Sequence, residues 1–320
     1  MSVGSVKTII NKFDKFVVSA HINPEGDSIG SQIAIASLLT RLGKEVLILN
    51  ESPVPHFLQF MGGADKILNK IPPDLHFQAV IILDCPVLAR VGNISEAITK
   101  DKVVINIDHH VSNENFGRYN WVDPMISSTG EMIFELFKAF KLKIEYSEAV
   151  ALYVAIMTDT GSFRYTNTSA ETHKRIAELV DIGVKPYDIF KSIYEVNSLQ
   201  AINLLSEALK TLKLTDDGYI AWLWVTKEML KKTKASLDGI EGMINFARSI
   251  EGVQIAILFR ETGTENRCKV SFRSKDKADV NKLASFFGGG GHATASGCIV
   301  SGKTEEVEKA VLKKAQEMLD

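Results

Sequence analysis

Three features that this 320-residue chain lacks narrow the classes of protein to which it can belong. Its hydrophobic runs are all far shorter than the ~18 to 20 apolar residues that a membrane-spanning helix needs. Residues 1–15 contain no apolar segment of the kind found in a secretion signal. The three cysteines are an odd number without C-x-x-C spacing, which argues against a disulfide framework and a structural zinc site. We therefore expect a cytoplasmic protein that does not associate with membranes.

The chain also lacks an excess of positive charge, because 37 Lys and Arg residues face 39 Asp and Glu residues. This balance argues against a large nonspecific nucleic-acid surface, although it is compatible with a local basic pocket. A phosphate-bearing ligand should therefore be small or short. With 45% hydrophobic residues, the chain is long enough for two domains, each with its own core.

In the first part of the chain, short apolar runs alternate with helical patterns. Strands are predicted at 16–20, 45–49, 79–83 and 102–107, and helices at 27–42, 129–140, 147–157 and 169–182. This alternation is typical of an α/β domain with a doubly wound parallel sheet, which we place at residues 1–185.

The second part of the chain has a different order of elements. Residues 186–212 form a polar helical pattern that is predicted to connect two domains. Residues 213–320 are predicted to form a smaller mixed-sheet α/β domain across a cleft from the first, with strands at 218–224, 254–259, 267–274 and 297–300 and helices at 237–250, 280–287 and 304–319.

Acidic and imidazole side chains follow several apolar runs of the first domain. They are His21, Glu25 and Asp27 after 16–20, Asp84 after 79–83, Asp108, His109 and His110 after 102–107, and Asp159 after 151–157. We group the last run with the strand ends, although 147–157 also has a helical pattern. Chemistry in open α/β sheets sits just beyond the carboxyl ends of the strands, so four such ends meeting in one crevice would make a metal site.

Each of these residues has an ordinary explanation when taken alone, such as a surface histidine, a helix cap or a turn aspartate. Together, the carboxylates of Glu25, Asp27, Asp84 and Asp159 would repel one another and become protonated unless cations were present. Two divalent ions carry the charge that balances four carboxylates. The sequence therefore favours a binuclear metal centre over a carboxylate acid/base pair.

The ligand types restrict the identity of the metal. Carboxylate oxygens with one or two imidazoles suit Mn²⁺ or Mg²⁺. We expect two Mn²⁺ ions per chain, with Mg²⁺ or another divalent ion as the alternative. Two such ions ~3.5 to 4 Å apart activate a hydroxide for in-line attack on phosphorus. Phosphoester hydrolysis is the predicted reaction.

A four-glycine run at 288–291, followed by His292, is the second distinctive feature. Such a run can be a flexible hinge, but consecutive glycine N–H groups can also approach an anion closely. In the neighbouring predicted strand, a period of two places Cys268, Val270 and Phe272 on the core side and Lys269, Ser271 and Arg273 on the other. The neighbours of the glycine run favour a phosphate-binding pocket.

The ordered set of motifs resembles the DHH phosphoesterase superfamily. The motifs are HINPEGDSIGS at 21–31, Asp84, the triplet at 108–110, Asp159, and GGGGHATASG at 288–297. More narrowly, the chain resembles the nanoRNase/pAp-phosphatase branch with its DHH-associated C-terminal domain. Members of this branch degrade very short oligonucleotides and remove the 3′-phosphate of 3′-phosphoadenosine 5′-phosphate (pAp). The resemblance spans nearly the whole chain.

The resemblance implies a role for each candidate residue. One metal ion is bound by His21, Glu25 and Asp84, and the other by Asp27, Asp84, His109 and Asp159, so that Asp84 bridges the two. His110 faces the scissile phosphate, and Asp108 orients the imidazoles. A second pocket holds another part of the substrate and consists of Arg273, Gly289, Gly290, Gly291 and His292. The family usually has Asp where this chain has Glu25, so that ion would be reached by a longer side chain.

We therefore expect a Mn²⁺-dependent nanoRNase acting on short single-stranded RNA and dinucleotides, with pAp as a further substrate. A homodimer is the family-level expectation. A phosphodiesterase for cyclic or linear dinucleotides (c-di-AMP or pApA) would share every motif. A RecJ-type exonuclease and a family II pyrophosphatase fit less well, the first by length and charge and the second by its C-terminal pattern. A non-catalytic nucleotide-binding sensor is the alternative from another class, and the intact Asp84 and 108–110 triplet argue against it.

Overall fold

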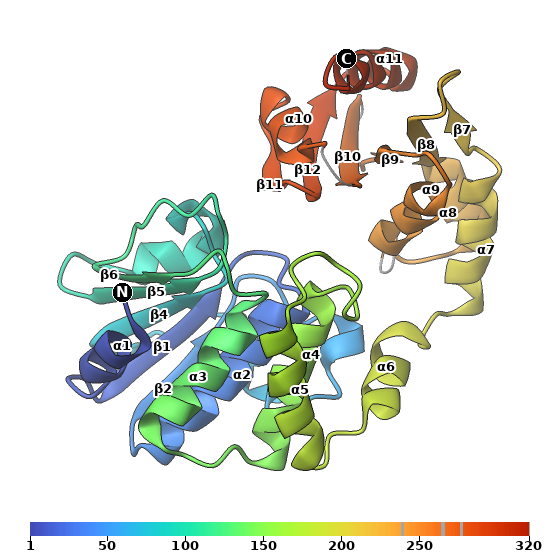
Figure 1. Cartoon of the computed structure of the whole chain (residues 1–320). Helices are drawn as coiled ribbons and strands as arrows, with labels where there is room; N and C mark the ends of the chain where they lie inside the picture. Colours follow the sequence, from blue (N-terminus) through green and yellow to red (C-terminus); the bar gives the residue numbers. More distant parts are fainter. Residues whose placement is uncertain (238–239, 264–265, 276–277, 320) are drawn as a thin grey trace. The chain divides into compact units, whose positions relative to one another are not determined.

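The computed structural model of the chain describes residues 1–237, 240–263, 266–275 and 278–319, while the side chains of Glu241 and His292 lie outside the described part. The chain divides into two compact units, Met1–Val196 and Asn197–Asp320 (Figure 1). The division falls inside the segment predicted to connect the domains. Among the described residues, no helix combines the length and the apolar character needed to cross a bilayer.

The first unit is built on a six-stranded sheet in which every strand is parallel to its neighbours. The strands are β1 (Lys15–Ala20), β2 (Glu45–Leu49), β3 (Ile67–Leu68), β4 (Ala79–Leu83), β5 (Val103–Asp108) and β6 (Tyr119–Val122). Their order in the sheet is β3-β2-β1-β4-β5-β6, so the direction of winding reverses between β1 and β4. This is the order of a doubly wound sheet, as predicted, with β3 and β6 as additional short edge strands.

Both faces of this sheet are covered by hydrophobic residues. In β1, Phe16 and Val18 join the core beneath α2 (Gly26–Arg41), α3 (Thr129–Phe140) and α4 (Tyr146–Asp159). The intervening Val17 joins a second core with Val91 and Ile94 of the 3₁₀ segment η3 (Leu88–Ala97). Burial on both faces explains why these strands are continuous apolar runs and not alternating ones.

This unit contains further helical elements besides α2, α3, α4 and η3. They are α1 (Val3–Ile10), η1 (His56–Leu58), η2 (Ala64–Lys66), α5 (Ala170–Asp181) and α6 (Pro186–Tyr194). Figure 1 shows α2, α3, α4 and α5 gathered on one side of the sheet.

Two glycines of α2 let this helix pack unusually closely against α4. A Cβ atom on Gly30 would lie 2.3 Å from the carbonyl oxygen of Ala151, and one on Gly26 would lie 2.4 Å from Oγ1 of Thr158. Any larger residue would therefore force the two helices apart. The close contact brings the start of α2, which carries Asp27, next to the end of α4, which carries Asp159.

The second unit contains a mixed sheet of the order β11-β12-β10-β9-β8-β7. Only the β8–β9 pairing is parallel among the described strands, and the others are antiparallel. The strands are β7 (Lys213–Leu214), β8 (Ile220–Val225), β9 (Ile255–Glu261), β10 (Arg267–Ser274), β11 (Gly290–His292) and β12 (Ala295–Ser301). The predicted mixed-sheet domain is therefore confirmed.

Helices cover this sheet on both faces as well. Residues of α10 (Val280–Phe286) and α11 (Thr304–Gln316) form one core with the sheet, and those of α7 (Leu199–Leu209), η4 (Ile240–Met243) and α9 (Ile244–Ser249) form the other. A further helix, α8, spans Lys227–Thr233. The single helix predicted at 237–250 is wrong in part, because Leu237 is not helical, 238–239 lie outside the described residues, and the rest is divided between η4 and α9.

Candidate metal centre

The predicted site residues of the first unit gather at the carboxyl end of the sheet, where the winding reverses. His21 directly follows β1, Asp84 directly follows β4, and Asp108 is the last residue of β5. Because β1, β4 and β5 are adjacent and parallel, their ends lie side by side. This is the position at which open α/β sheets bind their ligands.

Asp27 lies in the first turn of α2 and is held by the start of another helix. Its Oδ2 accepts a hydrogen bond from the backbone N–H of Thr129 at 2.7 Å, and its Oδ1 accepts one from Gly130 at 2.8 Å. The hydroxyl of Ser31 also donates to Oδ1, at 3.1 Å. Thr129 and Gly130 are the first residues of α3, so the helix N-terminus stabilises the buried carboxylate as an anion.

Asp84 lies at the centre of the cluster, and its two oxygens face different histidines. Oδ2 is 3.5 Å from Nε2 of His21, whereas Oδ1 is 3.6 Å from Nε2 of His109 and 3.6 Å from Nδ1 of His110. The backbone of Asp84 is in the left-handed region, with φ of 51°, which an aspartate adopts more readily than most residues. A carboxylate shared in this way is suited to bridge two cations.

His109 connects the central carboxylate to the two aspartates contributed by helices. Its Nε2 lies 3.7 Å from Oδ2 of Asp27 and 3.4 Å from Oδ2 of Asp159. Asp159 is the last residue of α4. Our grouping of Asp159 with strand ends is therefore wrong, because the apolar run that precedes it is a helix buried beneath the sheet, as the helical pattern at 147–157 indicated.

Asp108 orients His110. Its Oδ1 lies 2.6 Å from Nδ1 of His110 and accepts the backbone N–H of His109 at 2.9 Å. Its Oδ2 accepts a hydrogen bond from the side chain of Asn113, which also donates to Oδ1 of Asn106. Asp108 is fully buried, so this network fixes its carboxylate and, through it, one imidazole ring.

Among the residues that the structure describes, two sets of potential ligand atoms result, each with its atoms within 4.8 Å of one another. The first comprises Asp84, His109 and His110, and the second comprises Asp27, His109 and Asp159. His21 contacts Asp84 but belongs to neither set. Glu25 is exposed at the N-terminus of α2 and also belongs to neither, although its charge acts on Asp159. The ligand role of these two residues stays a prediction, as does that of the residues in the two sets.

The electrostatics of the cluster fit a cation. Burial, together with the charges of Asp84 and Asp159, raises the pKa of Asp27 well above its usual range. Burial likewise raises the pKa of Asp159 to about 6, with Asp84 and Glu25 contributing. Burial alone would lower the pKa of His109, but the surrounding carboxylates outweigh it and raise this pKa well above its usual range. The oxygen and imidazole donors of this acidic cluster match the preferences of Mn²⁺ and Mg²⁺.

Sequence reasoning missed the residues that hold the ligands in place. Ser28 and Ser31 lie within the quoted motif at 21–31, but their hydrogen bonds to Asp84 and Asp27 depend on how the elements meet. Asn113 acts on Asp108, five residues before it, whereas the backbone N–H groups of Thr129 and Gly130 act on Asp27, about a hundred residues away in the chain. The only local signal was Ser128, whose hydroxyl caps α3 by accepting a hydrogen bond from the N–H of Glu131.

The second unit places Arg273 in β10 and the glycine run at the start of β11, and β12 lies between these two strands in the sheet. Cys268, Val270 and Phe272 of β10 are buried in one core, which confirms the predicted alternation. Arg273 is half-buried, and its Nη1 donates to the backbone carbonyl of Phe272 at 3.0 Å.

The glycine run has a structural role that the sequence reading did not include. Gly290 and Gly291 belong to the edge strand β11, which pairs with β12. A Cβ on Gly289 would lie 2.2 Å from the carbonyl oxygen of Gly297, and one on Gly291 would lie 2.5 Å from that of Ala295. These glycines permit close approach of the two strands. The side chain of His292 lies outside the described residues, so its role stays a prediction.

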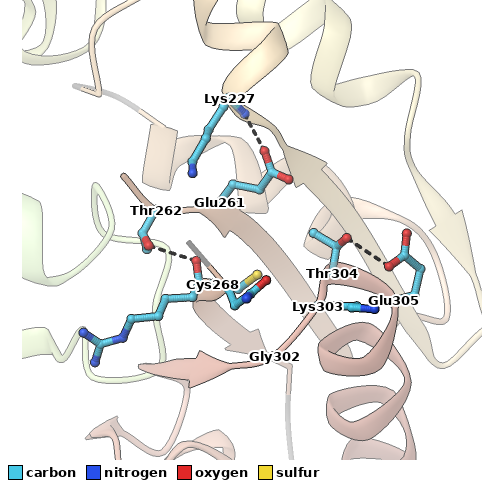
Figure 2. A pocket seen from close by; sticks show the side chains of 10 residues that line it. Lys227, Glu261, Thr262, Cys268, Gly302, Lys303, Thr304 and Glu305 are labelled. Atoms are coloured by element: carbon cyan, nitrogen blue, oxygen red, sulfur yellow. Dashed lines mark hydrogen bonds between the residues drawn. The ribbon is translucent and has the colours of Figure 1, made fainter. Parts of the chain in front are cut away.

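A separate cavity of about 190 Å³ opens on the second unit (Figure 2). It lies at the start of β10, at the opposite end of this strand from Arg273. Lys227, Arg267 and Lys303 line it together with Glu261 and Glu305. The oppositely charged groups give this cavity no evident preference for phosphate.

Two family models match the chain. The N-terminal domain of the DHH family matches residues 15–156, and the DHHA1 domain matches residues 221–320. Together with the acidic and imidazole cluster, these matches define the class: the chain belongs to the DHH family and is a metal-dependent phosphoesterase.

Its relatives within the family can be named more narrowly. The bifunctional oligoribonuclease and PAP phosphatase NrnA of Thermus thermophilus is 29% identical, over 94% of this chain and 89% of that protein. The protein of the same name from Bacillus subtilis is 26% identical, over 91% of each chain.

Solved structures agree with the fold. An exopolyphosphatase-related protein from Bacteroides fragilis superimposes with a TM-score of 0.90 and 30% identity, over 99% of this chain and 97% of that one. RecJ of Thermus thermophilus, solved in complex with Mn²⁺, matches with a TM-score of 0.51 and 11% identity, over 98% of this chain and 54% of that one. This second likeness shows the fold alone.

Proposed function

We propose that the chain hydrolyses phosphoester bonds in short oligoribonucleotides and removes the 3′-phosphate of pAp, with two divalent ions, preferably Mn²⁺, at the Asp84 cluster. The observation that carries the proposal is the position of Asp84, whose two oxygens face His21 on one side and His109 and His110 on the other. The substrates are those in the names of two relatives that align over 91% or more of this chain.

In this proposal, which follows the family resemblance and not the two geometric sets above, the ligands would divide into two groups that share Asp84. His21 and Glu25 would complete one set, and Asp27, His109 and Asp159 would complete the other. Two bound divalent ions would neutralise the acidic cluster, polarise the phosphoryl group and make water acidic enough to react at neutral pH. The helix N-terminus at Thr129 and the hydroxyl of Ser31 hold the carboxylate of Asp27.

His110 would contact the scissile phosphate through Nε2. Asp108 holds the opposite ring nitrogen, at 2.6 Å, and thereby fixes the ring and favours a hydrogen on Nδ1. Asp108 itself is fixed by Asn113. A ring held on one edge in this way has a defined direction in which to meet a substrate oxygen.

Residues of the second unit would bind a further part of the same substrate. The guanidinium of Arg273 suits a phosphate because it offers several N–H donors in one plane. The backbone N–H groups of Gly289, Gly290 and Gly291 and the side chain of His292 would complete this subsite.

A substrate panel tests the proposal. The chain is treated with EDTA, freed of chelator, and assayed with pAp, a diribonucleotide, a triribonucleotide and a long single-stranded RNA, with Mn²⁺, Mg²⁺ or Zn²⁺ added. We expect no turnover without metal, the best recovery with Mn²⁺, and much faster cleavage of the short substrates than of the long RNA. Turnover after exhaustive chelation, or failure to cleave both pAp and the short oligonucleotides with every ion, would contradict the proposal.

A further inference from the structure

Ser28 is a buried residue that contacts two of the proposed ligands at once. It lies in the first turns of α2 and is fully inaccessible to solvent. Its Oγ donates a hydrogen bond to Oδ2 of Asp84 at 2.5 Å and lies 3.0 Å from Nε2 of His21. Both partners directly follow strands of the sheet, so these contacts join α2 to the sheet and not to another helix.

The hydroxyl of Ser28 restricts rotation of the Asp84 carboxylate. A serine hydroxyl has one hydrogen, and here Asp84 accepts it. With Oδ2 fixed by this bond, Oδ1 is directed toward His109 and His110, 3.6 Å away in each case. Without the bond, the carboxylate could rotate about its Cβ–Cγ bond. Its two oxygens would then no longer face different histidines.

We propose that Ser28 is a positioning residue that keeps one oxygen of Asp84 toward His21 and the other toward His109, and so sets the affinity of the centre for its ions. This inference rests on the proposed function, because it assumes that Asp84 bridges two ions. Residues that orient ligands in this way typically change metal affinity by 10- to 100-fold when they are removed.

The chain provides a matched control in Ser19. Ser19 is also fully buried and lies near the end of β1. Within the described part of the chain, its hydroxyl has no hydrogen-bond partner. Ser19→Ala and Ser28→Ala therefore remove the same group from equally buried positions, but only Ser28→Ala removes a bond to a proposed ligand.

Ser31 provides a second comparison. It is fully buried on α2, the helix that carries Ser28. Its hydroxyl donates a hydrogen bond to Asp27, which belongs to only one of the two ligand sets. Ser31→Ala should weaken the binding of one ion, whereas Ser28→Ala should disturb the residue that both ions share.

The test is a Mn²⁺ titration of the wild type and the Ser19→Ala, Ser28→Ala and Ser31→Ala variants after chelation has removed their metal. Calorimetry measures the affinity for Mn²⁺, and electron paramagnetic resonance records the signal of the bound ion. We expect Ser28→Ala to weaken Mn²⁺ binding by about tenfold or more. It should also lose the spin-coupled signal of a bridged Mn²⁺ pair, which Ser19→Ala retains. Thermal melting of the metal-free forms should place Ser28→Ala only slightly below Ser19→Ala, because Ser28→Ala also loses a buried hydrogen bond.

Three outcomes would overturn the inference, and they are distinguishable from one another. Equal Mn²⁺ affinity and equal spectra for Ser28→Ala and Ser19→Ala, with a wild type that binds two ions and hydrolyses pAp, would remove the role of Ser28 alone. A much lower melting temperature of metal-free Ser28→Ala would assign the residue to folding instead. A wild type that binds no Mn²⁺ would overturn both this inference and the proposed function.

Discussion

Replacement of Gly30 by alanine should separate the two helices that bring Asp27 and Asp159 together. The added Cβ would lie 2.3 Å from the carbonyl oxygen of Ala151 and 3.0 Å from Cβ of Ala155. Both atoms belong to the helix α4 itself and not to the flexible end of a side chain, so the backbone must move. Overpacking of this kind costs about 1 to 3 kcal/mol.

The intrinsic preference of alanine for helices acts in the opposite direction, by about 0.5 to 1 kcal/mol. The clash should outweigh it, because a contact of 2.3 Å is far inside van der Waals distance. We expect a net loss of stability on the order of 1 to 2 kcal/mol, or roughly 2 to 8 °C in melting temperature. Mn²⁺ affinity should fall as well, since the separation of α2 and α4 moves two proposed ligands apart.

The matched control is Gly4→Ala in α1, where the added Cβ would meet only Oγ of Ser2, at 3.9 Å. Thermal unfolding followed by circular dichroism, with and without Mn²⁺, compares the two variants with the wild type. Gly4→Ala should be as stable as the wild type or slightly more so. If Gly30→Ala has the same melting temperature as Gly4→Ala and the same Mn²⁺ affinity as the wild type, the close approach of α2 and α4 does not set the geometry of the site.

Three further predictions concern other parts of the account. Arg273→Ala should raise the KM for pAp by roughly ten- to a hundredfold, because it removes a charged hydrogen bond worth ~1.5 to 3 kcal/mol. The effect on bis-p-nitrophenyl phosphate should be much smaller, and Lys269→Ala on the same strand is the control. Equal losses on both substrates would argue against a second subsite. Glu25→Gln should weaken Mn²⁺ binding while Glu25→Asp keeps substantial activity, and unchanged affinity of the Gln variant in a metal titration would exclude Glu25 as a ligand. Burial raises the pKa of the Cys85 and Cys298 thiols to about 12, so both should stay un-ionised and unreactive toward iodoacetamide at pH 8; rapid modification of the native chain, located by mass spectrometry, would contradict their burial.

The strands of the first unit were predictable because parallel strands buried on both faces leave continuous apolar runs. β1, β4 and β5 carry this signal, and the ligands that follow them could be named from it. β3 and β6 were missed because they have two and four residues, too few to show a pattern. The run before Asp159 was ambiguous because α4 is buried on several sides, and a buried helix is as uniformly apolar as a buried strand.

The supporting contacts of the site were not predictable from one sequence. Asp27 is held by the first N–H groups of α3, about a hundred residues away in the chain, and this pairing exists only once α2, α3 and α4 have packed. Ser28 and Asn113 are likewise ordinary polar residues until the fold places them against Asp84 and Asp108. Glu25 shows the converse case, in which a residue implied by the motif lies at the exposed edge of the cluster.

The central claim is that Asp84 bridges two metal ions that are required for hydrolysis. The most direct measurement is turnover of pAp by chelated protein as Mn²⁺ is added stepwise, for the wild type and for Asp84→Asn. The account predicts that wild-type activity rises until two Mn²⁺ ions are bound per chain, and that Asp84→Asn stays inactive at saturating Mn²⁺ while it remains folded. Activity that saturates without bound metal, or substantial turnover by folded Asp84→Asn, would contradict it.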